Sequence, residues 1–211
     1  MPTLYHFMDC PHCFKIRVYL SQRGLEYHSA VVARGHLPPE LPSLNPLRRL
    51  PVWVTDDNKP LFGANTIIDF LEQTAAAPRL VPEDPLRRAR CWMADEMAVE
   101  GLLEPLIALD REMQGKEPGS WNLARYQKQT AKIKAILDVF EQLLGNRPWL
   151  VGDEMSLADL SLALPLTILE RFGLDLAALP GLENLALRLA DLPSVAEARK
   201  QPSSQTARFE R

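Results

Sequence analysis

The feature that most constrains the fold is a change of pattern near residue 75. Segments before that point alternate between strand-like and helix-like spacing, whereas the later segments have helical spacing alone. The stretch between them, AAAPRLVPEDP at Ala75–Pro85, is rich in proline, as is typical of a domain boundary. Because 211 residues suffice for two small domains, we predict an α/β domain over residues 1–75, a linker over residues 76–85 and an all-helical domain over residues 86–211.

The order of segments in the first part defines a fold. Strand-forming residues fill four short segments, at 3–7, 25–32, 51–54 and 61–62. Helical spacing fills two longer segments, at 11–23 and 64–74, and the stretch at 33–46 is expected to be a loop. A parallel crossover followed by a hairpin and a helix is the thioredoxin arrangement. We therefore predict a thioredoxin-like N-terminal domain.

The predicted helical domain contains four helical segments, at 86–113, 121–145, 157–172 and 182–191. The first is one long helix or a bent pair, with Gly101 or Pro105 at the kink. In the stretch MSLADL, Ser156 precedes a helix and Asp159 occupies its third position, which is the aspartate form of a capping box. We interpret Asp159 as structural rather than catalytic.

Composition excludes several classes of partner. The net charge of −3 argues against nucleic acid, and the sequence has no run of about 18 apolar residues, so we expect no membrane span. The start, MPTLYHFMD, lacks the basic and apolar regions of an export signal. We therefore expect a cytoplasmic protein, in a reducing compartment where a permanent disulfide is rare.

The stretch DCPHC places Cys10 and Cys13 three residues apart, which allows a structural bridge, a metal site or redox chemistry. The reducing compartment argues against the bridge. A structural zinc site needs four ligands, but only Cys91 remains, and the four histidines form no paired motif. We therefore predict no metal site, with an iron–sulfur cluster shared between two chains as the remaining alternative.

The chain resembles the glutathione transferase superfamily over nearly its whole length. The pieces that carry the resemblance are CPHC, NPLRRLPVW, TIIDFLE, LVPEDPLRRARCW, RPWLVGDEMSLADLSL and GLENLALRLADLPSV. Within the superfamily, LYHFMDCPHCFKIRVYL is most similar to bacterial two-domain glutaredoxins and to disulfide-reducing transferases that bear a cysteine. The resemblance implies glutathione as cosubstrate, a homodimer, and redox chemistry at the cysteine pair.

The residues around the pair support that chemistry. Pro11 suits the first helical position, which makes Cys10 the N-cap, with backbone N–H groups facing its sulfur. These groups lower a thiol pKa. Cys13, one turn further in, is expected to be buried and to remain a thiol. The alternative is that both are small buried residues at a helix start.

The resemblance also implies glutathione contacts. Pro51 matches the family's cis proline, and Leu50 before it would pair its backbone with the cysteine part of glutathione. The family usually places an acidic or amide residue and then serine where this chain has Gly63 and Ala64. Ala64 still offers a backbone N–H to a carboxylate, and Asn65 or Thr66 could replace part of the lost contact. We therefore predict weak glutathione binding.

Three functions compete at this stage. The first is a glutathione-linked thiol–disulfide oxidoreductase with Cys10 as nucleophile, acting on small-molecule or protein disulfides. The second is a transferase that conjugates or dehalogenates small electrophiles, which would bind between the domains near Met97, Leu106 or Trp121. The third is a non-catalytic interaction protein on the same fold, like the stringent-starvation regulators.

Overall fold

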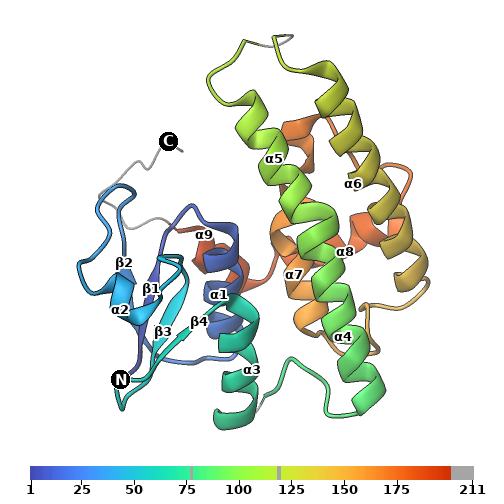
Figure 1. Ribbon diagram of the computed structural model, residues 1–211. Helices are drawn as coiled ribbons and strands as arrows, with labels where there is room; N and C mark the ends of the chain where they lie inside the picture. The colour runs from blue at the N-terminus through green and yellow to red at the C-terminus, as the bar shows by residue number, and fades with distance from the viewer. Residues whose placement is uncertain (77, 118–119, 201–211) are drawn as a thin grey trace. The chain divides into compact units, whose positions relative to one another are not determined.

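The computed structural model describes residues 1–76, 78–117 and 120–200 (Figure 1). The chain forms two compact units. The first comprises residues 1–79 together with the segment that starts at Pro193, and the second comprises Leu80–Leu192. The C-terminal segment thus joins the N-terminal unit, which corrects the prediction that residues 86–211 form one helical domain.

The first unit is built on a four-stranded sheet, as the sequence predicts. Its strands are β1 (Thr3–His6), β2 (His28–Val31), β3 (Val52–Val54) and β4 (Pro60–Phe62). They lie in the order β2-β1-β3-β4, with β1 parallel to β2 and the other pairs antiparallel. Only β2 is clearly shorter than predicted, because its pairing with β1 starts at His28.

Four helices accompany the sheet in the described part of this unit: α1 (Pro11–Gln22), α2 (Leu41–Leu44), α3 (Ala64–Thr74) and α9 (Pro193–Arg199). The bounds of α3 are those predicted, whereas α2 lies inside the expected loop. Helix α9 packs against α1, where Ser194 Oγ donates to Gln22 Oε1 at 2.7 Å and Ser21 Oγ donates to Glu197 Oε2 at 2.5 Å. Contacts on several sides explain why every residue of α1 from Cys13 to Leu20 is buried.

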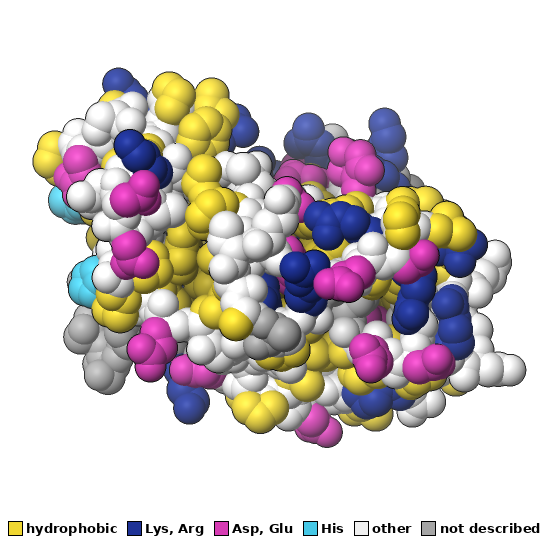
Figure 2. Space-filling view, turned by 90° about the horizontal axis from the view of Figure 1, so that it is seen from below, with side chains coloured by type: hydrophobic (Ala, Val, Ile, Leu, Met, Phe, Trp, Pro, Cys, Tyr) yellow, Lys and Arg dark blue, Asp and Glu magenta, His cyan; other side chains and the backbone are white. Residues whose placement is uncertain are grey.

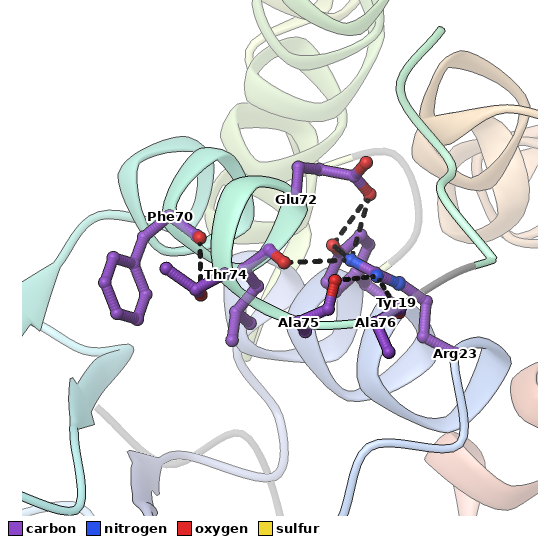
Figure 3. A network of polar contacts seen from close by, with 8 residues as sticks. Tyr19, Arg23, Phe70, Glu72, Thr74, Ala75 and Ala76 are labelled. Atoms are coloured by element: carbon purple, nitrogen blue, oxygen red, sulfur yellow. Dashed lines mark hydrogen bonds and ion pairs between the residues drawn. The ribbon is translucent and has the colours of Figure 1, made fainter. Parts of the chain in front are cut away.

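A buried polar network joins α1 to α3 (Figure 3). The Tyr19 hydroxyl donates to Glu72 Oε1 at 2.8 Å, and Arg23 forms an ion pair with the same oxygen at 3.3 Å. Arg23 also donates to three carbonyls at the end of α3, those of Leu71, Ala75 and Ala76. The Leu71 carbonyl also accepts from the Ala75 N–H, whereas those of Ala75 and Ala76 lie past the last turn of α3. Breaking a buried ion pair costs about 3–5 kcal/mol, so this network is a major support of the unit.

The second unit is helical, as predicted. It contains α4 (Pro85–Met97), a π-helical segment η1 (Ala98–Leu103), α5 (Glu104–Met113), α6 (Leu123–Leu144), α7 (Leu157–Thr167), a 3₁₀ segment η2 (Leu169–Phe172) and α8 (Pro180–Ala190). Fully buried leucine, isoleucine and phenylalanine side chains form its core, among them Leu102, Leu109, Ile133, Phe140, Leu162 and Leu185.

The long helix is irregular where the sequence predicts a kink. A Cβ at Gly101 would come within 2.9 Å of the Ile136 side chain, so α6 approaches closely here. Pro105 has no N–H for the turn before it, and Lys132 Nζ donates instead to the Glu100 carbonyl at 2.9 Å. The missing amide and the close approach of α6 account for the π-helical turn.

The predicted capping box is present at the start of α7. Ser156 is the N-cap and Asp159 the third helical residue. Asp159 Oδ2 accepts from the Ser156 backbone N–H at 2.8 Å and from its hydroxyl at 2.9 Å, while Oδ1 accepts from the Leu150 N–H at 2.8 Å. The buried carboxylate is thus engaged in holding the helix start, which supports the structural interpretation.

The surface carries both signs of charge. Figure 2 shows acidic and basic side chains interspersed on the face in view, which agrees with the small net charge. In the described part of the chain, the helices are too short or too polar to cross a membrane.

Candidate active site

The strand register brings three chain segments to one edge of the sheet. Tyr5 in β1 pairs with Val52 in β3, which pairs in turn with Phe62 in β4. Because these neighbours are antiparallel, the end of β1, the start of β3 and the end of β4 share an edge. The segments that follow or precede them there carry the predicted cysteine pair, the Leu50–Pro51 peptide and the Gly63–Ala64 pair.

Cys10 is the N-cap of α1, as predicted, with φ −86° and ψ 123° and Pro11 in the first turn. The Cys13 thiol and the backbone N–H groups of Cys13 and His12 lie near the Cys10 sulfur and favour its thiolate form. The thiol of Cys13 is the largest influence, burial opposes it, and the positive potential of His12 adds to it. Together they lower the pKa of Cys10 to about 6. A large fraction of Cys10 is therefore thiolate at neutral pH.

Cys13 has the opposite character, as the sequence predicts. Its side chain is fully buried, and burial raises its pKa well above the ordinary value. The neighbouring Cys10 raises it further, by hydrogen bonding to the protonated thiol and by its charge. Cys13 is therefore a thiol while Cys10 is a thiolate. In this arrangement Cys13 is the hydrogen-bond donor and Cys10 the acceptor.

The Leu50–Pro51 peptide bond is cis, as predicted. Leu50 is buried in one apolar cluster with Cys13, and Cys10 packs against that cluster. The structure thus brings Cys10, Cys13 and Leu50 together, although they are far apart in the sequence.

Gly63 and Ala64 form the start of α3, and Gly63 is its N-cap with φ +88°. Asn65 does not extend into an empty site, because its side-chain oxygen accepts from Lys15 Nζ at 2.7 Å. Lys15 itself is buried on α1. This bond joins the start of α3 to α1, and it makes Asn65 a poor candidate for replacing the missing acidic residue of the family.

Arg34 also lies in this region, although no sequence pattern predicts it there. Its Nε donates to Asp9 Oδ2 at 2.6 Å, and its guanidinium lies 4.8 Å from the centre of the Phe7 ring. The hydrogen bond with Asp9 is the main cause of the raised pKa of Arg34, and the charges of Asp9, Cys10 and Cys13 add to it, which places the guanidinium near the pair. Because Arg34 lies 24 positions after Cys10, no local motif signals this contact.

Three of the remaining candidate residues of the sequence, Cys91, Leu106 and Trp121, lie in the second unit. Cys91 is buried in α4, where burial raises its pKa to about 11, so it is a packing residue. Within the described residues, no group of three or more histidine, cysteine or acidic side chains could hold a metal ion. Leu106 is a buried core residue, and Trp121 lies 5.8 Å from Tyr126 between ring centres.

Comparison with known proteins identifies the family. Residues 4–79 match the N-terminal domain of glutathione S-transferases, and residues 115–193 match their C-terminal domain. A maleylacetoacetate isomerase from Pseudomonas aeruginosa is 30% identical, over 97% of this chain and 99% of that protein. The chain belongs to the glutathione S-transferase family.

Other proteins similar to this chain differ in their names. FtsZ-localized protein A of Caulobacter vibrioides is 30% identical, over 81% of this chain and 78% of that protein. A solved glutathione S-transferase from Methylobacterium radiotolerans, in complex with glutathione sulfonate, is 26% identical with a TM-score of 0.80 and covers 98% of each chain. The predicted fold is confirmed, and so, at the level of the family, is an enzyme with glutathione as cosubstrate.

Proposed function

We propose that this glutathione S-transferase is a glutathione-linked thiol–disulfide oxidoreductase with Cys10 as its nucleophile. The observation that carries the proposal is the position of Cys10 at the N-cap of α1, beside the Cys13 thiol, with a pKa of about 6. A thiolate at an N-cap, next to a second thiol, is suited to disulfide exchange.

In the first step, the Cys10 thiolate attacks the glutathione sulfur of a mixed disulfide between glutathione and a substrate thiol. A bond forms between Cys10 and glutathione, the substrate–glutathione S–S bond breaks, and the substrate leaves as a thiolate that takes a proton from water. The low pKa of Cys10 supplies the nucleophile in its reactive form near neutral pH.

A second glutathione then resolves the enzyme. Its thiolate attacks the glutathione sulfur of the mixed disulfide on Cys10, which releases oxidised glutathione and restores the Cys10 thiolate. Overall, the mixed disulfide is reduced to the substrate thiol, and one free glutathione leaves as oxidised glutathione together with the glutathione of the mixed disulfide. Cys13 provides an intramolecular alternative, but burial is the main cause of its raised pKa and persists after Cys10 is modified. We therefore propose the glutathione route as the main one.

The proposed glutathione contacts are the Leu50 backbone, beside the cis Pro51, and the backbone N–H of Ala64. An N–H at a helix start suits the γ-glutamyl carboxylate. We further propose that the protein acts as a homodimer in a reducing cytoplasm, on small-molecule or protein disulfides.

A second candidate function is favoured by the relatives named maleylacetoacetate isomerase, which match over nearly the whole chain. In a conjugation or isomerisation, the thiolate that attacks the electrophile would belong to bound glutathione. Cys10 would then lie near that thiolate without forming a covalent bond.

Two cysteine variants separate these functions. We expect Cys10→Ser to reduce the turnover of a small glutathione mixed disulfide to the uncatalysed rate, and Cys13→Ser to retain part of it. Conjugation of glutathione to a chlorinated aromatic and isomerisation of maleylacetoacetate would be measured beside it. Retained disulfide turnover in Cys10→Ser refutes the proposal, and isomerase or transferase activity that survives in that variant supports the second function. Inactivity in all assays supports an interaction protein.

A further inference from the structure

Arg17 is a buried cation on the helix that begins at the cysteine pair. It lies on α1, seven positions after Cys10, and 6% of its surface is exposed. Its NH1 donates to the Phe7 carbonyl at 3.0 Å, and its NH2 donates to the Met8 carbonyl at 3.0 Å. One guanidinium therefore holds two successive carbonyls of the segment that leads from β1 to Cys10.

These two hydrogen bonds fix the segment between β1 and Cys10 against helix α1. The Phe7 backbone N–H donates to the Cys13 sulfur, so the same residue is held from both sides. Cys10 follows Met8 by two residues and is the N-cap whose sulfur must face the N–H groups of His12 and Cys13. Because N-cap geometry depends on the backbone angles of a few residues, the direction of the Cys10 sulfur depends on where this segment lies.

Arg17 also joins the segment to the C-terminal helix of its unit. Its NH2 donates to the Ala198 carbonyl in α9 at 3.0 Å. That carbonyl lies in the last turn of α9, where helical partners are missing. The last turn of α9 and the approach to Cys10 are thus bound to the same guanidinium nitrogen.

The side chain next to the Arg17 guanidinium is His6, which is neutral and does not compete with Arg17 as a cation. The NH1 of Arg17 lies 3.3 Å from His6 Nδ1, and because Arg17 can only donate, His6 accepts there and carries its proton on Nε2, 2.8 Å from Ser29 Oγ. Burial, and then the charge of Arg17, lower the pKa of His6 to about 4, so His6 is neutral. The titratable or charged groups that face Arg17 or Cys10 across these elements are His6, Asp9, His12, Cys13, Tyr27 and Arg34.

We propose that Arg17 is a positioning residue for the Cys10 thiolate. Its hydrogen bonds to the Phe7 and Met8 carbonyls set the N-cap geometry, and its hydrogen bond to the Ala198 carbonyl holds the guanidinium against α9. The inference rests on the proposed role of Cys10, but it concerns the state of the thiol and not the substrate. Its effect is therefore measurable without any disulfide.

The test compares Arg17→Met and Arg17→Lys with Arg23→Lys. Arg23 is a matched control, because it is the C-cap of the same helix and is also 6% exposed. It also donates to three backbone carbonyls, but these lie at and just after the end of α3. The pKa of Cys10 would be taken from its alkylation rate with iodoacetamide between pH 4 and 9, with the labelled peptide identified by mass.

We expect Arg17→Met to raise the pKa of Cys10 by about one unit, which lowers alkylation at pH 5 about tenfold. Arg17→Lys keeps the charge but cannot donate to the Phe7 and Met8 carbonyls from two separate nitrogens. The pKa of Cys10 in this variant should therefore lie between those of Arg17→Met and the wild type. Arg23→Lys should lower the melting temperature with an unchanged pH profile. A wild-type pH profile in either Arg17 variant overturns the proposal.

A measurement on the wild-type protein keeps the proposal testable even if the variants do not fold. The guanidinium nitrogen resonances of Arg17 should shift in the NMR spectrum when Cys10 is alkylated, whereas those of Arg23 should not. Unmoved Arg17 resonances overturn the inference. A Cys10 that behaves as expected here but reduces no disulfide refutes the proposed function and leaves the role of Arg17 intact.

Discussion

The Cys13 thiol donates a hydrogen bond to the Cys10 sulfur, and this bond is the largest influence that lowers the pKa of Cys10 to about 6. The same bond raises the pKa of Cys13, because it holds the proton on the donor. The two cysteines are therefore one acid–base unit, in which the buried thiol favours the thiolate of its partner.

The first prediction separates the hydrogen bond from the redox role of Cys13. Cys13→Ala removes the donor and should raise the pKa of Cys10, whereas Cys13→Ser keeps an O–H donor and should remain close to the wild type. Because thiolate is lost as pH falls through the pKa, alkylation of Cys10 at pH 5–6 should slow in the alanine variant alone. Identical pH profiles for the two variants would show that the helix N–H groups suffice.

The second prediction concerns the cap of α7. Ser156→Ala removes the hydroxyl that donates to Asp159 at 2.9 Å, although the backbone bond at 2.8 Å remains. We expect a loss of about 1 kcal/mol in the free energy of unfolding, or a fall of about 2–4 °C in melting temperature. The control is the alkylation rate of Cys10, because the cap belongs to the other unit. A changed rate with an unchanged melting temperature would contradict the structural role.

The third prediction tests the backbone at the start of α3. Gly63 has φ +88°, a value that residues with a Cβ rarely adopt. Gly63→Ala should therefore cost about 1–3 kcal/mol in the free energy of unfolding, measured by urea denaturation. An alanine variant of full stability would mean that the backbone relaxes to a negative φ. The same strain makes the family's acidic residue difficult to introduce here.

The fourth prediction concerns glutathione affinity. A missing charge-assisted hydrogen bond to the γ-glutamyl amine costs about 1.5–3 kcal/mol, or roughly 10- to 150-fold in affinity. Wild-type binding should thus be weak in calorimetry, and Ala64→Ser, which adds a hydroxyl for the γ-glutamyl carboxylate, should tighten it.

Cysteinylglycine, which lacks the γ-glutamyl group, provides the control for that experiment. Its affinity should be lower than that of glutathione in the wild type, because it lacks the carboxylate that the Ala64 N–H would bind, and it should not change in Ala64→Ser. Tight wild-type binding of glutathione alone would show that another residue already binds the γ-glutamyl group.

The sequence alone was sufficient for features that depend on neighbouring residues. Pro11 after Cys10 predicts the N-cap, and Ser156 with Asp159 predicts the cap of α7, because capping involves atoms within one turn. The alternation of strand and helix spacing likewise predicts the sheet, and proline and glycine predict where the long helix becomes irregular.

Only the tertiary structure decided which distant groups meet the cysteines. Arg17 and Lys15 lie on the same helix, but packing directs Arg17 to the Phe7 and Met8 carbonyls and Lys15 to Asn65. Helix α9 joins the first unit although it follows the helical one in the sequence. Helical spacing shows which side chains share a face but not which element covers that face, and a buried cation is placed by whichever carbonyls and carboxylates the fold brings within hydrogen-bonding distance.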